Sequence, residues 1–160
     1  MLTTPSLLAE LDARPAQWVV EGTLDASVTA VAALLFAVAA GRVGDDNLLV
    51  LARASAARQG AMTVVPEPGA GVYCAEFAGS VQPVEIQVDP TGSRLAVQSW
   101  YAGVYVATAC STGTRVTHRV HQVLPDHPGF AAGIAELGLR ARMARDLAQV
   151  LGVIADRLGC

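Results

Sequence analysis

The feature that most constrains this chain is a change of pattern along its length. From residue 61 to residue 124, stretches rich in β-branched and aromatic residues are interrupted at short intervals by turn sequences such as PEPGAG, DPTG and CSTG. Strand-like stretches with frequent turn signals are typical of an antiparallel meander. We therefore expect about five strands here, in the segments AMTVV, VYCAEFA, VEIQV, RLAVQSWYAGVYVATA and TRVTHRVHQVL.

The C-terminal segment has a different periodicity. From Gly129 onward the turn sequences stop, and small or apolar residues recur at alternating steps of four and three, at Phe130, Ile134, Leu137, Ala141, Ala144, Ala148, Leu151, Ala155 and Leu158. That spacing predicts one long amphipathic helix. Its apolar stripe must be buried, and the concave face of a twisted meander is the available partner.

The part of the chain before the meander is predicted to hold three helices and one strand. Residues 3–13 carry leucines at helical spacing, and Pro15 ends that helix. The segment QWVVEGTL then predicts a strand. Ser27 is a suitable N-cap for an apolar helix from Val28 to Ala40, and a further helix is expected from Asp46 to Gly60.

Composition limits the kinds of function. A chain of 160 residues fits the single domain that we expect over residues 1–160. Its residues are 52% hydrophobic but only 5% aromatic, so Ala, Val and Leu must fill most of the core, where they either pack densely or line a hollow. A formal charge of −3 and a pI near 5.5 give no reason to bind nucleic acid, because that affinity depends on basic residues.

The cysteines and the most apolar segment indicate the compartment. Cys74, Cys110 and Cys160 are widely spaced and form no CxxC motif, which argues against a disulfide framework or a zinc site and favours a reducing cytoplasm. The N-terminus lacks the basic region of a signal peptide. The segment VTAVAALLFAVAAG has 14 residues, whereas a bilayer span needs about 20. We expect a buried or partner-covered helix there and no membrane span.

The order of these elements resembles the helix-grip fold of the START/SRPBCC superfamily, which includes birch-pollen-allergen-like proteins, polyketide cyclases and dehydrases, and lipid-transfer domains. The similarity covers Gln17 to Leu158 and is carried by QWVVEGTLDAS before a helix, by VEIQVDPTGSRLAVQSWYAGVYVATACSTGTRVTHRVHQVLP as the last strands, and by GFAAGIAELGLRARMARDLAQVLGVIADRLG as the closing helix.

The resemblance implies an α+β fold: a curved antiparallel β-sheet wrapped around a long C-terminal α-helix, with two short helices after the first strand. The helix over residues 3–13 is an addition to that pattern, and the helix after the first strand is unusually apolar. The resemblance also implies a hollow between sheet and helix that holds an apolar or aromatic small molecule. It implies no single activity, because one fold serves both enzymes and carriers.

Two turns predict the strand register and therefore the face of each side chain. The DPTG hairpin is expected to place Ile86 opposite Leu95, and the CSTG hairpin to place Tyr105 opposite His118. Both hairpins agree on an inner face made of Val84, Ile86, Val88, Leu95, Val97, Ser99, Tyr101, Tyr105, Val116, His118 and Val120. We expect this mostly apolar face to meet the C-terminal helix.

The two histidines of the last strand are predicted to lie apart. His118 and His121 are three residues apart, and an odd separation in a strand puts them on opposite faces, so they cannot form a joint metal site. With no carboxylate cluster at metal spacing, we expect neither a metal nor another cofactor. His118 is the one titratable group on the predicted inner face and the best candidate for a catalytic residue; the alternative is a core histidine held by a Tyr hydroxyl or a backbone carbonyl.

The residues that we expect to line a ligand site share this inner face or the neighbouring strand. Near neutral pH an imidazole can donate or accept a proton, and a phenol can hydrogen-bond a ligand carbonyl. The predicted set is His118, Tyr101, Tyr105, Ser99, Val97, Val116, Val120, Tyr73 and Phe77.

Three functions follow from the sequence. The first is a binding protein for an apolar or aromatic, polyketide- or lipid-like small molecule. The second is an enzyme, a cyclase, dehydratase or isomerase without metal, that uses the same cavity. The third is an interaction module or homodimer that buries the apolar helix Val28 to Ala40 and the face around Trp100 against a partner.

Overall fold

The protein folds around one eight-stranded antiparallel sheet with the strand order β1-β8-β7-β6-β5-β4-β3-β2. The computed structural model describes residues 6–43, 62–77, 83–89, 91, 93–99, 101–123 and 138–160. The strands are β1 (Trp18–Leu24), β2 (Gly41–Arg42), β3 (Met62–Pro66), β4 (Val72–Phe77), β5 (Val84–Val88), β6 (Arg94–Gln98), β7 (Tyr101–Cys110) and β8 (Gly113–Val123), and the helices are α1 (Leu7–Asp12), α2 (Val28–Leu35) and α5 (Leu139–Leu158).

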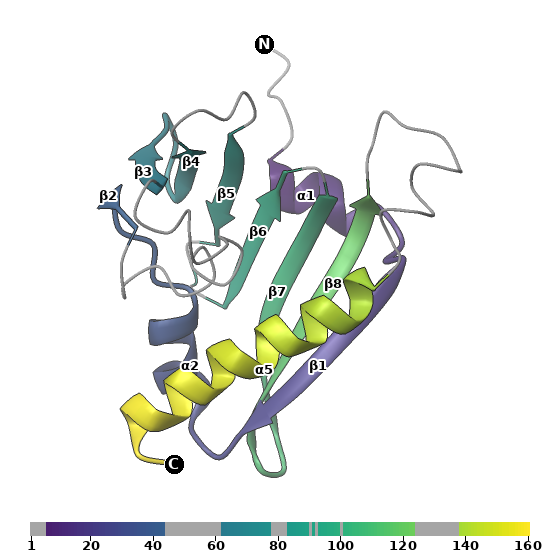
Figure 1. The fold of residues 1–160 in the computed structure, drawn as a ribbon, viewed down its shortest axis with the longest axis vertical. Coiled ribbons are helices and arrows are strands. Elements are labelled where there is room, and N and C mark those ends of the chain that lie inside the picture. Colours follow the sequence, from purple (N-terminus) through teal and green to yellow (C-terminus); the bar gives the residue numbers. More distant parts are fainter. Residues whose placement is uncertain are drawn as a thin grey trace.

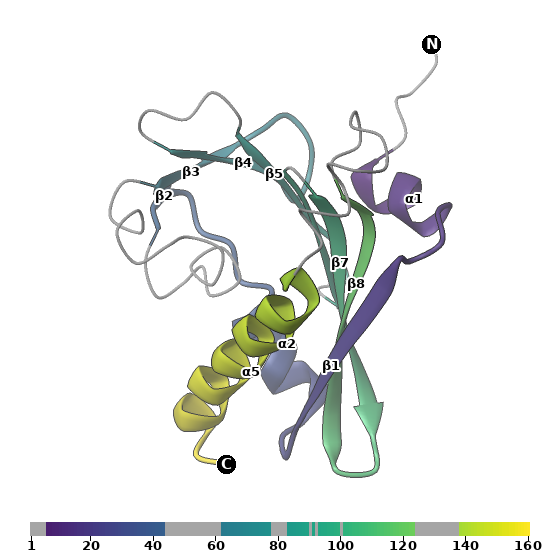
Figure 2. The ribbon, with the colours of Figure 1, turned by 45° about the vertical axis from the view of Figure 1, so that its right-hand side comes forward.

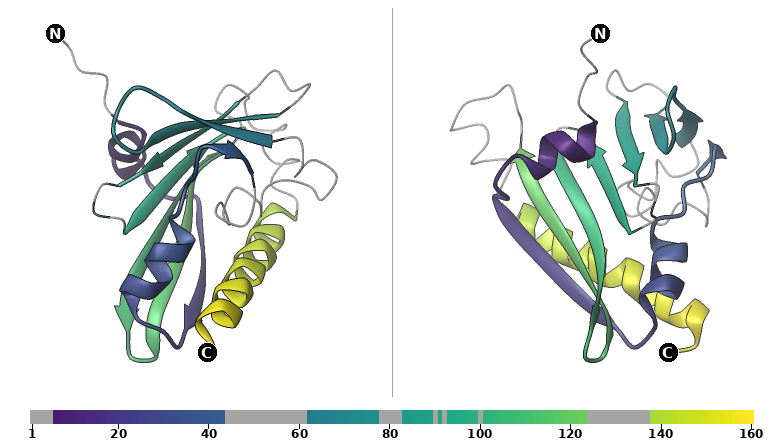
Figure 3. Two further views of the ribbon diagram at one scale, coloured as in Figure 1. Left: turned by 90° about the vertical axis from the view of Figure 1, so that its left-hand side faces the viewer. Right: turned by 180° about the vertical axis from the view of Figure 1, so that it is seen from behind.

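The helices lie on both sides of a strongly curved sheet (Figure 1). In Figure 2, β2 to β5 bend over toward the side on which α2 and α5 lie, so that the sheet is concave there. Helix α1 covers the opposite face over β6 and β7, as the view from behind in Figure 3 shows. The fold is therefore α+β, and a curved sheet around a long C-terminal helix with an additional N-terminal helix is the predicted helix-grip arrangement.

Each face of the sheet has its own apolar cluster. On the concave face, Val20, Ile86 and Val116 belong to a large buried cluster that includes the core residues of α2 and α5. On the other face, the three leucines of α1 pack on a smaller cluster formed by Ala96, Ala102 and Val104, with Val106 partly buried against it. This outer packing explains why β7 is apolar on both faces.

Helix α1 is held to the sheet by polar contacts as well as by its leucines. The backbone N–H of Leu8 donates to Gln87 Oε1 at 2.9 Å. Asp12 accepts from Arg94 Nη1 at 2.7 Å. The helix begins at its N-cap, Ser6, whose hydroxyl accepts from the backbone N–H of Ala9. The predicted N-terminal helix is thus present, and it belongs to the fold.

The meander has more strands than the sequence predicts. The segment from Arg94 to Ala109, expected as one strand, forms two strands, β6 and β7, that pair with each other. In the turn between them, the N–H of Ser99 donates to Tyr101 O at 2.8 Å. The sequence between the two strands lacks Gly and Pro and continues into Trp100 and Tyr101, residue types of high β propensity, so no local signal marks the turn.

The predicted register is correct at one hairpin and shifted at the other. Tyr105 lies opposite His118, as expected. Ile86 lies opposite Val97 rather than Leu95. The N–H of Asp89 donates to Arg94 O, so Asp89 and Arg94 form the last pair before the turn. A shift of two residues keeps every side chain on its face, and the predicted inner-face residues within the strands are buried or packed in the concave cluster, whereas Ser99 lies in the turn between β6 and β7.

The pairing of β7 with β8 also contains an irregularity that the sequence did not predict, and its extra residue, His121, lies on β8. The CSTG register would place Gln122 opposite Tyr101, but a register shift between Ala102 and Gly103 places Val123 there. A shift of one residue between neighbouring pairs is the mark of a β-bulge, which increases local twist.

The buried face of α5 differs from the predicted stripe. The buried residues of α5 are Leu139, Met143, Leu147, Val150, Leu151 and Ile154. Of the predicted stripe, Leu151 is buried and Ala155 and Leu158 are partly buried against the core, whereas Phe130, Ile134 and Leu137 lie outside the described residues. The prediction counted alanines as core residues, but Ala141, Ala144 and Ala148 are exposed. The larger side chains decide the orientation of the helix because each removes more apolar area from water than an alanine does.

Helix α2 is shorter than expected. Its predicted N-cap is confirmed, since Ser27 Oγ accepts from the N–H of Ala30 at 3.2 Å. The helix was expected to reach Ala40 but ends at Leu35, and the chain continues to β2, where Gly41 pairs with Val64. Tertiary pairing therefore overrides the helix propensity of the alanines that follow Leu35. The further helix expected at Asp46 to Gly60 lies outside the described residues.

Candidate ligand-binding site

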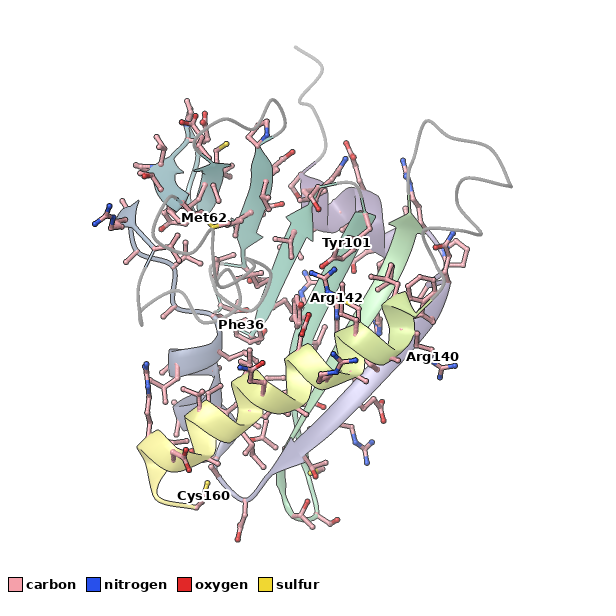
Figure 4. All side chains as sticks on the ribbon, in the orientation of Figure 1. Phe36, Met62, Tyr101, Arg140, Arg142 and Cys160 are labelled. Atoms are coloured by element: carbon pink, nitrogen blue, oxygen red, sulfur yellow. The ribbon has the colours of Figure 1, made fainter. Side chains whose placement is uncertain are left out.

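His118 lies on the concave face of the sheet, between Val20 of β1 and Tyr105 of β7. It lies on β8, has no exposed surface, and stands directly opposite Tyr105 of β7. The two rings are stacked, with centroids 3.9 Å apart and planes inclined by 9°. The ring of Tyr101, labelled in Figure 4, is tilted by 56° to the imidazole at a centroid distance of 6.4 Å. The structure thus brings together the three ring residues that the sequence predicted.

The backbone beneath the imidazole is shaped to admit it. Gly103 precedes Tyr105 by two residues on the same face, and a Cβ atom at Gly103 would lie 2.6 Å from His118 Nε2. No carbon and nitrogen atom approach so closely without a bond, so only glycine leaves room for this ring position. On the other side of β8, Val20 of β1 pairs with His118. Tyr105, Gly103 and Val20 therefore hold the imidazole in place.

The burial of His118 is exceptional among the polar side chains of the described residues. Apart from the tyrosines, Thr114 and His118 are the only polar residues that are buried in the part of the chain that the structure describes. Thr114 has an evident structural role, since its hydroxyl donates to Ala26 O at 2.7 Å. Burying a polar side chain in an apolar cluster costs free energy, so its presence calls for a structural or functional reason.

The predicted aliphatic lining lies where the sequence places it. Val97, Val116 and Val120 are all buried on the concave face. Tyr73 is half-buried and packs against the same cluster. Phe77 lies on β4 with its backbone opposite Met62, but its side chain is outside the described part of the structure. Val97, Val116 and Val120 make the surroundings of His118 apolar, whereas Tyr73 and Phe77 lie on β4, which β5, β6 and β7 separate from β8.

Ser99 does not join this group. It lies in the turn between β6 and β7 rather than within a strand, and it lines a hollow together with Gln98 and Glu85. Trp100, expected on the outer face, lies outside the described residues. Val104 and Val106, its predicted neighbours on that face, pack against α1.

The second histidine is separated from the first, as predicted. His121 Nδ1 lies 2.9 Å from the carbonyl oxygen of Arg14, on the chain that links α1 to β1. His118 faces the concave cluster instead. Within the described ranges, no three His, Cys, Asp or Glu side chains gather in a way that could hold a metal ion.

Two surface hollows of a size suited to small molecules are lined by described residues. The first, of about 760 Å³, lies between β1 and the first turns of α5 and is lined by Val19, Val20, Glu21, Gly138, Arg140, Ala141 and Ala144. The second, of about 660 Å³, lies over β4, β5 and the end of β6 and is lined by Glu67, Pro68, Val72, Tyr73, Cys74, Pro83, Glu85, Gln98 and Ser99.

Two cysteine thiols differ in acidity. Burial raises the pKa of the Cys74 thiol, and the carboxylates of Glu76, Glu67 and Glu85 raise it further. At the β7–β8 hairpin, hydrogen bonding to Thr112 lowers the pKa of the Cys110 thiol, with a further contribution from Arg115. The hairpin brings Arg115 to Cys110 from the adjacent strand, a proximity that no local sequence motif shows.

The fold and the buried ring cluster define an α+β helix-grip protein with an inward-facing histidine. No protein-family model matches the chain, and no curated protein matches it. Among solved structures, the crystal structure of TTHA0849 from Thermus thermophilus is similar, with a TM-score of 0.51 and 18% sequence identity over 87% of this chain and 94% of that chain. A likeness at this identity shows a shared fold. No helix within the described ranges is both long and apolar enough to cross a membrane.

Proposed function

We propose that this protein binds an apolar or aromatic small molecule, of polyketide- or lipid-like character, between the concave face of the sheet and α5. We further propose that it belongs to the START/SRPBCC helix-grip superfamily. The observation that carries the proposal is the burial of His118 in an otherwise aliphatic layer, stacked on Tyr105 and cleared by Gly103.

The chemistry of the concave face supports such a ligand. Aliphatic side chains surround the rings, and removing apolar ligand surface from water contributes about 25 cal/mol per Å². Such contacts give affinity but little orientation. His118 and the hydroxyls of Tyr101 and Tyr105 supply the few convergent polar groups that orient a ligand in a typical small-molecule site.

The test is native mass spectrometry of the protein purified from its own host. We expect a non-covalent adduct that is lost on denaturation, and its mass gives the chemical class of the ligand. His118→Phe keeps a flat ring against Tyr105 but removes both nitrogens, so adduct occupancy should fall. The matched control is His121→Phe on the other face, which should retain the adduct.

The outcome against the proposal is equally specific. The proposal is wrong if the wild-type protein carries no adduct and its thermal midpoint is unchanged by apolar aromatic compounds. Turnover of the identified ligand that is lost in His118→Phe while binding is kept would favour the cyclase, dehydratase or isomerase alternative. Unchanged turnover would remove His118 from that chemistry.

A further inference from the structure

The hollow beside β1 is bounded by a close contact between α5 and β1. At Gly22, a Cβ atom would overlap Leu151 Cδ1, so the helix touches the strand there. Toward the N-terminus of α5, the hollow of about 760 Å³ separates the same strand and helix. Helix α5 and strand β1 are therefore in contact at Leu151 and Gly22 and are separated near the N-terminus of α5.

The walls of this hollow are suited to an apolar molecule. Val19 and Val20 form part of the strand wall, and Ala141 and Ala144 form part of the helix wall. The two alanines are exposed, although a sequence pattern places them in the core. Because they are small, this side of α5 leaves space that Leu or Met would fill.

Two charged residues line the hollow, one from the strand and one from the helix. Glu21 is on the strand and Arg140 is in the first turn of α5, where Figure 4 shows it projecting on the side of β1. The first turn of α5 contains no acidic residue, so the partial positive charge of the helix N-terminus adds to that of Arg140. The helix wall therefore favours an anionic group, and the strand wall opposes one.

Val20 connects this hollow to the ring cluster. Val20 lines the hollow, is buried, and pairs with His118 across β1 and β8. Directly paired residues on one face of a sheet have Cβ atoms about 5 Å apart. A molecule seated in the hollow thus lies one side chain away from the imidazole.

We propose that this hollow is the opening through which the ligand reaches His118, that Val20 separates the two, and that Arg140 selects ligands with an anionic group on an apolar aromatic body. This inference rests on the proposed function, because it assigns the route and the charge of the same ligand. It predicts that filling the hollow blocks binding and that removing the Arg140 charge affects only anionic ligands.

Two fluorescent probes separate shape from charge. 1-Anilinonaphthalene-8-sulfonate and N-phenyl-1-naphthylamine share the same rings, but only the first carries a sulfonate. Titration of each into Ala144→Trp should give at least about tenfold weaker binding than the wild type, because the indole occupies the hollow. Val153→Trp is the matched control: position 153 is exposed and about 180° around the helix from position 144, so both probes should bind it normally.

The two charge variants are expected to change the affinity for the sulfonate probe in opposite directions. Arg140→Gln should weaken sulfonate binding by about three- to tenfold and leave the uncharged probe within about twofold. Glu21→Gln should strengthen sulfonate binding and leave the uncharged probe unchanged. Thermal unfolding of each hollow and control variant checks that the fold is intact, which is expected because all of these positions are exposed.

The results distinguish the route from the function. Binding that falls in His118→Phe but not in Ala144→Trp overturns the route and leaves the proposed function standing. Binding of both probes that is insensitive to every variant overturns the route and the role of His118 together. Failure of the wild type to bind either probe contradicts both proposals.

Discussion

At the scale of single residues, the position of the His118 ring depends on the space that its neighbours leave free. The imidazole fits because Gly103 has no side chain and because Tyr105 presents a flat ring. Strand alternation alone places His118 on the inner face, whereas the space that it occupies depends on three strands, β1, β7 and β8. The direction of the His118 side chain is therefore set by the local strand, whereas the position of its ring is set by tertiary packing.

Gly103→Ala should destabilise the protein. The added methyl group meets His118 Nε2 at 2.6 Å and Arg119 O at 3.2 Å, and the buried ring cannot move away without losing its stack on Tyr105. Overpacking of this kind costs about 1–3 kcal/mol of unfolding free energy. Urea denaturation measures it.

The control for this variant is Gly152→Ala, at a helical position where nothing lies within 4 Å of the added methyl group. It should raise stability by up to about 1 kcal/mol, because alanine is the better helix former. In Gly103→Ala/His118→Ala the clash is removed, so the two substitutions should be non-additive. Strict additivity would show that Gly103 does not act through His118.

Asp89 should make the folded state sensitive to acid. Hydrogen bonds from the Thr91 N–H and hydroxyl, then from Arg94, hold the pKa of Asp89 below its usual value. With a lowered folded pKa, the unfolded state binds more protons, so this stabilisation is present above about pH 4 and is lost as the pH falls through the folded-state pKa.

Asp89→Asn should therefore lower the free energy of unfolding by about 1 kcal/mol at pH 7 and by clearly less near pH ~2.5. Urea denaturation at both pH values measures the difference. Asp156→Asn, at an exposed position of α5, serves as the control and should have little effect. An equal loss at both pH values for Asp89→Asn would show that its charge does not stabilise the fold.

At the scale of elements, α5 shows which side chains determine the buried face of a helix. Its sequence offers two apolar stripes, one rich in alanine and one in Leu, Met, Val and Ile, and the second faces the core. A periodicity that counts alanine equally with leucine selects the wrong stripe. The alanine side then becomes available to line the hollow beside β1.

Substitutions on the two stripes should have very different effects. Leu147→Ala removes a buried side chain from the core and should cost about 2–4 kcal/mol of unfolding free energy. Ala148→Ser, one position along on the exposed side, should change stability by less than about 0.5 kcal/mol. Thermal and urea denaturation measure both variants. A larger loss for Ala148→Ser than for Leu147→Ala would contradict the orientation of α5.

At the scale of the whole molecule, the sheet is stabilised unevenly. Strands β7 and β8 have strands on both sides and helix α2 against their concave face, and α1 covers β7 on the other face. At the far edge, β2 contributes two residues and, within the described ranges, pairs with β3 only. The first strand in the chain joins the last one, so the sheet is complete only when both ends of the sequence meet.

Hydrogen exchange should follow this arrangement. We expect the paired amides of β7 and β8 to exchange last, near the rate of global unfolding, and those of β2 and β3 to exchange first, because edge pairs open locally. Hydrogen–deuterium exchange with mass spectrometry measures both regions in one experiment. Slower exchange in β3 than in β8 would contradict this order.

Much of the fold could be predicted because it is encoded locally. Alternation places Val97, Val116 and His118 on one face, and the CSTG turn pairs Tyr105 with His118. The sequence-based predictions are wrong where contacts between residues far apart in the chain determine the structure. The turn after Gln98 has no glycine or proline, and the end of α2 depends on pairing between β2 and β3.

The sequence by itself determined the fold class, the inward direction of His118 and its separation from His121, because strand alternation and turn chemistry act over a few residues. Only the tertiary structure decided which stripe of α5 is buried, how Gly103 clears the imidazole, and where a hollow opens beside β1. These features depend on side-chain volumes from elements far apart in the chain. Volumes become complementary only when the elements pack together.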